Sequence, residues 1–353
     1  MTDHGAQAQA LLRATGSDAD RGERILKISD LKVHFDLPDD QVAKAVNGVS
    51  LGVAAGETLA VVGESGSGKS VTGLTVLRIL MRAPARIAGG EVRYRTKDGK
   101  LVDLLGLPES EMSALRGSEI SMIFQDPMSS LNPVFPVGEQ IAEGLRLHQG
   151  LSRREARARS VELLTMVGIA EPEARVDEFP HQLSGGMRQR VMIAMALACA
   201  PRLLIADEPT TALDVTIQAQ IMELLKDLKE RTGMAMIFVT HDLNLVAEIA
   251  DRVAVMYCGQ VVEEGSVAEV LERPRHPYTR ALMDCIPEID ADTRNARVRP
   301  IPGRIANPLS PPPGCKFNPR CRYATDLCRT TEVELQDTGD GHTSRCLHWS
   351  ELE

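Results

Sequence analysis

A glycine-rich run that directly follows an apolar stretch constrains this sequence more than any other feature. Residues 58–62 read TLAVV, a continuous apolar run typical of a central buried strand. Residues 63–70 then read GESGSGKS, which matches G-x-x-x-x-G-K-[ST] at every fixed position. Residues 69–80 have the pattern of a helix. Strand, glycine-rich turn and helix in this order favour a phosphate-binding loop over a chance glycine-rich turn.

The residue types in this loop fit the chemistry of phosphate binding. Glycines allow backbone N–H groups to point at phosphates, and the start of the helix adds the positive end of its dipole. We expect Lys69 to reach the β- and γ-phosphates of ATP, and the Ser70 hydroxyl to ligate Mg²⁺. The predicted nucleotide-binding residues of the loop are Gly63, Glu64, Ser65, Gly66, Ser67, Gly68, Lys69, Ser70 and Val71.

A second apolar run ends in two carboxylates. Residues 203–208 read LLIADE, so Asp207 and Glu208 come at the carboxyl end of a predicted buried strand. Asp207 is placed to hold Mg²⁺ through water, and Glu208 points the other way because side chains alternate along a strand. Glu208 is therefore the predicted base that orients and deprotonates the attacking water. The alternative is that Asp207 and Glu208 are two surface acids without a catalytic role. The phosphate-binding loop earlier in the chain makes this alternative weaker.

The elements predicted along the chain alternate between strands and helices. Half-buried strands are predicted at 25–35 and 46–53 with a hairpin loop at 37–40, helices at 138–169 and 216–231, and a buried strand at 235–239. This alternation predicts an α/β fold with a parallel core. Dense prolines at 274–319 indicate a boundary. The predicted organisation is a disordered lead-in at 1–23, a nucleotide-binding domain at 24–270 with a helical subdomain at about 126–200, and a C-terminal extension at 271–353.

Charge and hydropathy narrow the class of protein. The formal net charge of −9 argues against nucleic acid as a partner, because that binding needs a basic face. No stretch approaches the ~18 apolar residues of a membrane-spanning helix. The first residues lack the basic start and apolar core of a secretion signal. We expect a cytosolic protein whose membrane contact comes through a partner.

Residues 183–190, LSGGMRQR, resemble the signature of ABC ATPases, which reads LSGGQ in most members. Met187 stands in place of the glutamine, at the most variable of the five positions. Ser184, with the backbone amides of Gly185 and Gly186 at a helix start, forms a second anion site. In that family this site closes over ATP held by the opposite subunit. The resemblance therefore implies a dimer with two composite sites, formed with an identical or a related second ATPase subunit.

Other family features follow in order. Gln125 resembles the Q-loop glutamine that senses Mg²⁺ and water, Asp214 the D-loop aspartate, and His241 the switch histidine that contacts the γ-phosphate. Phe35 lies where the family places an aromatic ring against adenine, with a plain strand-end aromatic as the alternative. The fold implied is a P-loop NTPase of the ABC type, a nucleotide-binding domain with a helical subdomain and a small cysteine-containing C-terminal extension.

Two further segments indicate transport. ABC ATPases also act in DNA repair and on ribosomes, but here about 115 residues without sustained heptads separate the phosphate loop from the signature. Residues 125–133, QDPMSSLNP, and 276–282, HPYTRAL, resemble the dipeptide/oligopeptide/nickel importer subfamily. This implies an ATPase that energises peptide uptake at the cytoplasmic face of the membrane. Its partners would be two transmembrane permease subunits and an extracytoplasmic substrate-binding protein; nickel and glutathione are the alternative cargoes.

A cysteine cluster occurs near the C-terminus, at Cys315, Cys321, Cys328 and Cys346. The segment is rich in proline and has little core of its own, which favours a metal clip over four unrelated cysteines. Zinc is the alternative, although the C-x2-C knuckles common at structural zinc sites are missing. The segment resembles the extension of peptide-importer ATPases, in which a [4Fe–4S] cluster is known in some members, so the cluster is favoured over Zn²⁺. His342 and His348 are candidate substitute ligands.

Overall fold

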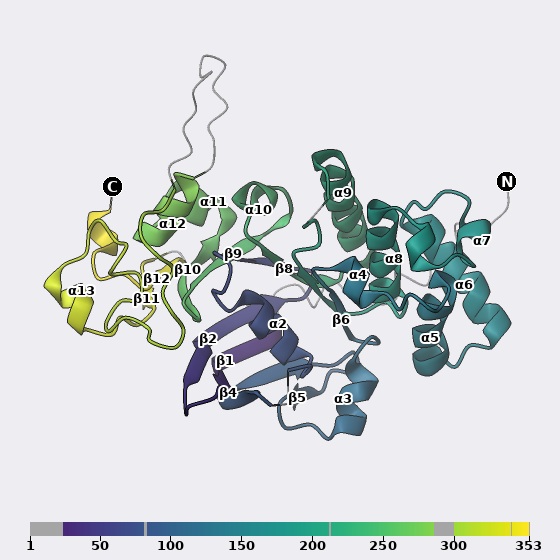
Figure 1. Cartoon of the computed structure of the whole chain (residues 1–353), viewed down its shortest axis with the longest axis horizontal. Helices are drawn as coiled ribbons and strands as arrows, with labels where there is room; N and C mark the ends of the chain where they lie inside the picture. Colours follow the sequence, from purple (N-terminus) through teal and green to yellow (C-terminus); the bar gives the residue numbers. More distant parts are fainter. Residues whose placement is uncertain (1–23, 81–82, 212, 286–299, 340, 353) are drawn as a thin grey trace, which may run out of the picture. The chain divides into compact units, whose positions relative to one another are not determined.

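The computed structural model describes residues 24–80, 83–211, 213–285, 300–339 and 341–352 (Figure 1). The predicted lead-in at 1–23 lies outside the described residues. The chain divides into two compact units. The first unit contains Val53–Glu57, Arg93–Val239 and the chain up to Leu26. The second contains Lys27–Gly52, Thr58–Val92 and Thr240–Glu353.

The first unit is built on parallel strands. β7 (Leu203–Asp207) pairs on one side with β6 (Ile120–Ile123) and on the other with β8 (Ala235–Thr240). Every residue of these strands is buried, which confirms the buried strands predicted at 203–206 and 235–239. Since parallel strands place their carboxyl ends at one edge, Asp207 and the residues after it lie at that edge.

The helices of the first unit pack mainly on one another. α5 (Val137–Gln149), α6 (Arg153–Met166) and α8 (Gly185–Leu197) are in mutual contact (Figure 1). The helical pattern predicted over 138–169 is confirmed, but as two helices, because Gly150 ends α5 with φ 67°. α9 (Val215–Thr232) matches the helix predicted at 216–231. Shorter elements are β5 (Leu101–Asp103), α3 (Glu109–Leu115), α4 (Pro127–Ser130), α7 (Pro172–Arg175) and the 3-10 helix η3 (Pro180–Gln182).

The second unit contains strands of both directions. β3 (Thr58–Val62) runs parallel to β9 (Arg252–Tyr257), and β9 is antiparallel to β10 (Gln260–Ser266). β1 (Arg24–Asp36) lies between β2 (Val42–Ala54) and β4 (Ala85–Arg95). The predicted strands at 25–35, 46–53 and 58–62 are therefore confirmed. A hydrogen bond of 2.8 Å from the Leu37 N–H to the Gln41 carbonyl closes the predicted loop between β1 and β2.

The helix after the glycine-rich run is shorter than predicted. α2 (Lys69–Val76) ends four residues before the expected end at Leu80. Arg78 adopts φ 54°, a left-handed conformation that interrupts the helical ladder. The remaining helices of this unit are α10 (Leu243–Ile249), α11 (Val267–Glu272), α12 (Pro277–Met283), α13 (Asp326–Thr330) and the 3-10 helix η4 (Trp349–Glu351). Across the described ranges, none of the helices has the length and apolar character needed to cross a bilayer.

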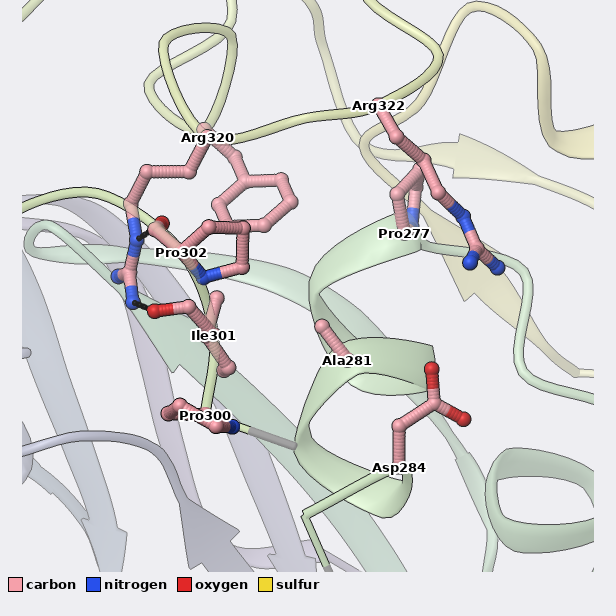
Figure 2. Close-up of a pocket in the computed structure, with 9 residues that line it drawn as sticks. Pro277, Ala281, Asp284, Pro300, Ile301, Pro302, Arg320 and Arg322 are labelled. Carbon is pink, nitrogen blue, oxygen red and sulfur yellow. Dashed lines mark hydrogen bonds between the residues drawn. The ribbon is translucent and has the colours of Figure 1, made fainter. Parts of the chain in front are cut away.

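The chain from Pro300 onward belongs to the second unit. β12 (Thr343–Ser344) pairs with β10, and β11 (Gln336–Asp337) pairs with β12. The Arg320 guanidinium donates hydrogen bonds to the carbonyls of Pro302, at 3.1 Å, and Ile301, at 3.5 Å (Figure 2). A cavity lies beside these bonds, lined also by Pro277 and Ala281 of α12 (Figure 2). Strand pairing and the hydrogen bonds of the Arg320 side chain therefore order a segment that the sequence indicates only as proline-rich.

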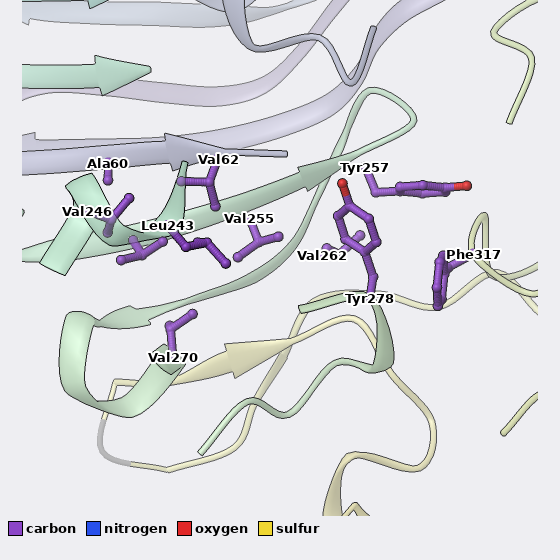
Figure 3. Close-up of a cluster of buried hydrophobic side chains, with 11 residues drawn as sticks. Ala60, Val62, Leu243, Val246, Val255, Tyr257, Val262, Val270, Tyr278 and Phe317 are labelled. Atoms are coloured by element: carbon purple, nitrogen blue, oxygen red, sulfur yellow. The ribbon is translucent and has the colours of Figure 1, made fainter. Parts of the chain in front are cut away.

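A buried cluster joins this segment to the strands of the second unit (Figure 3). Tyr278 of α12 and Phe317 lie in the same cluster as Tyr257 of β9 and Val62 of β3. Glu263 of β10, fully buried, accepts a hydrogen bond of 2.8 Å from His342 Nε2. The C-terminal segment thus shares a core with β3 and β9. The domain boundaries 24–270 and 271–353 stay a prediction.

Candidate nucleotide-binding site

The glycine-rich loop has a backbone that only glycine accommodates at two positions. Gly63 has φ 151° and Gly68 has φ 102°. A Cβ atom on Gly63 would lie 2.2 Å from the Met256 carbonyl oxygen, and one on Gly68 would lie 2.5 Å from that of Ala45. Both are backbone atoms that cannot give way. The glycines therefore let the loop pass close to neighbouring backbone, in addition to leaving room for phosphate.

The lysine and serine of the loop lie where the pattern predicts. Lys69, 5% exposed, begins α2, and its Nζ donates to the carbonyls of Gly63 at 2.7 Å and Glu64 at 3.1 Å. The ammonium group therefore lies against the loop it follows. Ser70 is half-buried in the first turn of α2. This is the local arrangement of a phosphate cradle: a glycine turn, a helix start and a cation together.

Two further predicted residues belong to the second unit. His241 follows β8 and is exposed, and the next residue, Asp242, caps α10 by accepting a hydrogen bond of 2.9 Å from the Asn244 N–H. Phe35 is half-buried near the end of β1. Its stacking on adenine stays a prediction, as does the contact of His241 with the γ-phosphate.

In the first unit, the structure brings two predicted residues together. Glu208 follows β7, and its Oε2 atom accepts a hydrogen bond of 3.0 Å from Gln125 Nε2, across 83 positions of sequence. The Thr211 hydroxyl donates to the same oxygen at 2.9 Å. Asp207, 5% exposed, is the last residue of β7. Glu208 is therefore a carboxylate held by two neutral donors at the carboxyl edge of a parallel sheet.

The signature segment opens a helix, as predicted. Ser184 is the N-cap of α8, and its hydroxyl accepts a hydrogen bond of 3.3 Å from the Met187 N–H. Asp214 caps α9 in the same way, and its Oδ1 atom accepts a hydrogen bond of 2.9 Å from the Ile217 N–H. A Cβ atom on Gly186 would lie 2.9 Å from Ile217 Cγ2, so the two helix starts are neighbours within this unit. Gly185 is the first residue of α8, and its backbone N–H lies at the positive end of the helix.

Sequence reasoning missed three residues that contact the predicted ones. Thr211 bonds Glu208, and its only local signal is its place just after the acidic strand. Tyr278 and Arg320 bond Glu64 from 214 and 256 positions away. Residue 278 lies in the HPYTRAL segment, which resemblance singled out without a role. No periodic pattern marks Arg320.

The cysteine cluster is partly assembled. Cys315, Cys321, Cys328 and Cys346 are free thiols that line one narrow cavity together with His348. Burial, with a smaller contribution from the neighbouring thiols, raises the pKa of Cys321 to about 11 and that of Cys346 to about 12. Within the part of the chain that the structure describes, no set of three or more His, Cys, Asp or Glu side chains is arranged to hold a metal ion. His342 is engaged with Glu263.

Comparisons with known families agree with this geometry. Residues 46–211 match the family described as ABC transporter, and residues 262–328 match the one described as oligopeptide/dipeptide transporter, C-terminal region. The first match contains the glycine loop, Gln125, the signature and the acidic strand. The second contains α12 and three of the clustered cysteines. The cassette and the C-terminal segment therefore each match a described family.

Full-length relatives and solved structures extend these matches. A putative peptide import ATP-binding protein of Brucella ovis is 50% identical over 332 residues, 93% of this chain and 98% of the relative. The oligopeptide transport ATP-binding protein AppD of Bacillus subtilis is 48% identical over 93% of this chain and 97% of its own length.

Among solved structures, the ATP-binding cassette MJ0796, a dimer in a post-hydrolysis state bound to ADP and Pi, has a TM-score of 0.60 at 30% identity over 69% of this chain and 98% of that one. CbiO1 of Clostridium perfringens, part of the ABC transporter complex cbiONQ, has a TM-score of 0.57 at 30% identity, over 71% of this chain and 91% of that one. The predicted fold class is therefore confirmed: this chain is an ABC-type ATPase cassette, and it belongs to the ATP-binding proteins of ABC transporters that carry the oligopeptide/dipeptide type of C-terminal region.

Proposed function

We propose that this chain binds and hydrolyses Mg-ATP and thereby energises the uptake of di- and oligopeptides across the cytoplasmic membrane. The observation that carries the hydrolytic part is the Glu208 carboxylate, held by Gln125 and Thr211 at the end of β7. Hydrogen bonds from Gln125 and Thr211 fix the direction of this carboxylate, and a base acting on water requires such a fixed direction. The peptide cargo is supported by the names of the relatives, which cover nearly the whole chain.

The roles of the residues follow from their chemistry. Lys69 and the loop amides would bind the β- and γ-phosphates, with Ser70 and Asp207 as the residues that hold Mg²⁺. When bound, Mg²⁺ neutralises charge on the phosphate oxygens. Glu208 takes the proton of the attacking water, and Gln125 helps to position that water. His241 is assigned to the γ-phosphate.

The proposed partners complete the site and the transporter. Ser184, Gly185, Gly186 and Asp214 lie at helix starts and would face ATP bound by a second ATPase subunit. Two permease subunits would carry the cargo, an extracytoplasmic binding protein would deliver it, and this chain would act at the cytoplasmic face of the membrane. Nickel and glutathione are the competing cargoes, and the names of the relatives favour peptides.

Uptake by the cells that make this chain tests the cargo. Lys69→Ala removes the cation that binds phosphate, so uptake of a labelled tripeptide should fall to background while uptake of labelled nickel continues. The purified Lys69→Ala chain should also release no phosphate from Mg-ATP. Unchanged peptide uptake with lost nickel or glutathione uptake would replace the cargo and keep the ATPase. Phosphate release by the Lys69→Ala chain at the parent rate would refute the assigned site.

We further propose that the clustered cysteines hold a [4Fe–4S] cluster. Cys315, Cys321, Cys328 and Cys346 line one cavity, and such a cluster takes one thiolate per iron. Zn²⁺ is the alternative, and the C-x2-C knuckles common at structural zinc sites are missing from this segment. The raised thiol pKa values mean that binding must displace protons, as metal sites do.

Metal analysis under anaerobic purification tests the cluster. We expect about four irons and four sulfides per chain. Broad visible absorption should accompany them and should be lost in Cys321→Ser. Cys258→Ser is the matched control, because Cys258 lies outside this cavity and should leave the iron content unchanged. One zinc per chain, or no metal in a folded chain, would refute the cluster and leave the ATPase proposal intact.

A further inference from the structure

Glu64, the second residue of the glycine-rich loop, forms an ion pair with the C-terminal segment. Arg320 Nη1 lies 2.6 Å from Glu64 Oε2, and Nη2 lies 2.9 Å from Oε1. The two parallel bonds make a fork-to-fork pair, the arrangement that fixes the direction of both side chains. The Arg320 side chain is 3% exposed and that of Glu64 is 22% exposed. The contact therefore excludes most water and joins residues 256 positions apart.

The Arg320 side chain is also held by contacts other than its ion pair with Glu64. Arg320 Nε donates to the Pro302 carbonyl at 3.1 Å (Figure 2). Its Nη1 atom lies 3.4 Å from the Tyr257 hydroxyl. The guanidinium carbon lies 5.8 Å from the ring centres of Tyr257 and Phe317. A planar cation fixed on several sides loses little further freedom when it binds a carboxylate. The guanidinium is thus a preorganised partner for Glu64.

A second contact reaches the backbone of the same loop residue. The Glu64 N–H donates a hydrogen bond of 2.8 Å to the Tyr278 hydroxyl. Tyr278 is fully buried, and its ring lies 4.7 Å from Tyr257 and 5.3 Å from Phe317 between ring centres (Figure 3). His276, the N-cap of α12, accepts a hydrogen bond of 3.1 Å from the Tyr278 N–H. The hydroxyl is therefore held by a rigid aromatic cluster.

Together these contacts hold one loop residue at three points. Arg320 binds the Glu64 side chain, Tyr278 accepts from its N–H, and Lys69 Nζ donates to its carbonyl. A phosphate-binding loop works through backbone N–H groups that are aligned before the ligand arrives. If the loop residue next to Gly63 is free to turn, part of the binding free energy is spent on ordering it.

We propose that Arg320 and Tyr278 are positioning residues of the phosphate loop, through which the C-terminal segment sets the nucleotide affinity of this ATPase. The inference rests on the proposed nucleotide site and adds a role for the C-terminal segment. Arg320 and Tyr278 bond Glu64, whereas the proposed base is Glu208. The chemical step at saturating ATP should therefore depend little on Arg320, whereas nucleotide affinity should depend strongly on it.

Calorimetric titration of the full chain with ADP and Mg²⁺ tests the proposal, together with kcat and KM for ATP. Arg320→Met keeps the length and apolar contacts of the side chain but removes the charged fork. We expect the Kd for ADP to rise about tenfold, the size of one lost charge-assisted hydrogen bond. KM for ATP should rise in parallel, with kcat changed less than twofold. Arg320→Lys should give a smaller rise, because it keeps the charge without the fork.

Tyr278→Phe and Arg322→Gln supply the second variant and the matched control. Tyr278→Phe removes the acceptor of the Glu64 N–H and should also raise the Kd, even if Arg320→Met does not fold. Arg322 lies two residues from Arg320, with its guanidinium carbon 4.9 Å from the Tyr323 ring centre, so Arg322→Gln should bind ADP as the parent does. All titrations are run below the unfolding temperature of each variant.

A Kd within twofold of the parent in both Arg320→Met and Tyr278→Phe would overturn the proposal. If Arg320→Met does not fold, an unchanged Kd in Tyr278→Phe would overturn it. An equal rise in Arg322→Gln would overturn it as well, since the effect would not be specific to the contact with Glu64. A parent chain that binds no nucleotide would instead refute the proposed function itself. The two failures are therefore distinguishable.

Discussion

At the scale of single residues, Glu208 combines an unusual backbone with a well-bonded side chain. Its φ of 45° lies in the left-handed region, and its N–H donates to the Val239 carbonyl at 2.9 Å. Such a conformation costs on the order of 1–3 kcal/mol at a residue other than glycine. The turn directs the carboxylate to Gln125 and Thr211. Strain and donors together give this carboxylate a fixed direction.

Replacing Glu208 by Gln should separate binding from hydrolysis. The amide keeps the size of the side chain and an oxygen that accepts from Gln125, but it cannot take a proton from water. Phosphate release should fall by about 10²–10⁴-fold, the range of a lost general base. Affinity for ATP, measured by filter binding, should stay within about twofold because the phosphate loop is unchanged. Glu223→Gln is a charge-matched control, because Glu223 is exposed in the middle of α9. Hydrolysis by Glu208→Gln at a tenth of the parent rate or more would exclude Glu208 as the base.

His276 should make stability depend on pH below neutrality. Complete burial lowers its pKa from 6.5 to about 3, because desolvation disfavours the charged form. The unfolded chain binds a proton below about pH 6.5 while the folded chain does not, so stability falls as pH drops from about 6.5 towards 3. Each pH unit in that window is worth about 1.4 kcal/mol, so this histidine alone removes about 2 kcal/mol by pH 5.

His276→Asn isolates this contribution. Asparagine keeps the N-cap acceptor for the Tyr278 N–H but does not titrate. The free energy of unfolding, measured in urea at pH 7 and pH 5, should differ between the two pH values by about 2 kcal/mol less in the variant than in the parent. Carboxylates titrate alike in both chains and cancel. An identical pH difference in the two chains would mean that His276 becomes protonated in the folded state.

At the scale of elements, two glycines between β3 and α2 are required for different physical reasons. Gly68 has φ 102° and neighbouring backbone 2.5 Å from a Cβ position, whereas Gly66 has φ 78° and no atom within 4 Å of that position. The start of α2 therefore depends on contact with Ala45 at one glycine and only on backbone freedom at the other.

Alanine at these two glycines should destabilise the chain unequally. Gly66→Ala adds left-handed strain alone, about 1–2 kcal/mol. Gly68→Ala adds a collision with the Ala45 carbonyl, so its loss of unfolding free energy should be at least twice as large. Urea unfolding without nucleotide measures both, with Gly99→Ala, also at positive φ and in open space, as the control. Equal losses for Gly66→Ala and Gly68→Ala would contradict the tight contact.

At the scale of the whole molecule, the C-terminal segment is part of the core of the second unit. β12 extends the sheet through β10, Glu263 pairs with His342, and Phe317 packs on Tyr257 with 5.3 Å between ring centres. Segments that share one core unfold together. The family match to a C-terminal region beginning at residue 262, within β10, agrees with this shared packing.

Removing the Phe317 ring should weaken the second unit as a whole. Phe317, 2% exposed, loses contacts with three aromatic rings in Phe317→Ala, and the expected cost is about 3–5 kcal/mol. Leu327→Ala is the control: Leu327 is 55% exposed and should cost about 0.5 kcal/mol or less. Calorimetry should show a single unfolding transition for this unit. Proteolysis sites within β9 and within the C-terminal segment should become accessible at the same temperature. Early release of the C-terminal segment alone would contradict the shared core.

Local sequence patterns predict much of the fold and of the site. Continuous apolar runs predicted β3, β7 and β8, because parallel strands are covered on both faces. The glycines at 63, 66 and 68 predicted a phosphate-binding turn, and all three adopt positive φ. Ser184 and Asp214 lie at helix starts, where short polar side chains cap. Such signals act over a few residues, so they can be read without knowing what packs against them.

The contacts across long stretches of sequence were decided by packing. The bond between Gln125 and Glu208, the place of Thr211 and the early end of α2 follow from how strands and turns meet. The sequence alone determined that this chain has a phosphate loop, an acidic strand and a signature helix, since each is a local arrangement of backbone and side chain. Only the tertiary structure decided that Arg320 and Tyr278 hold Glu64, because a contact over more than 200 residues leaves no periodic trace and depends on the shared aromatic core.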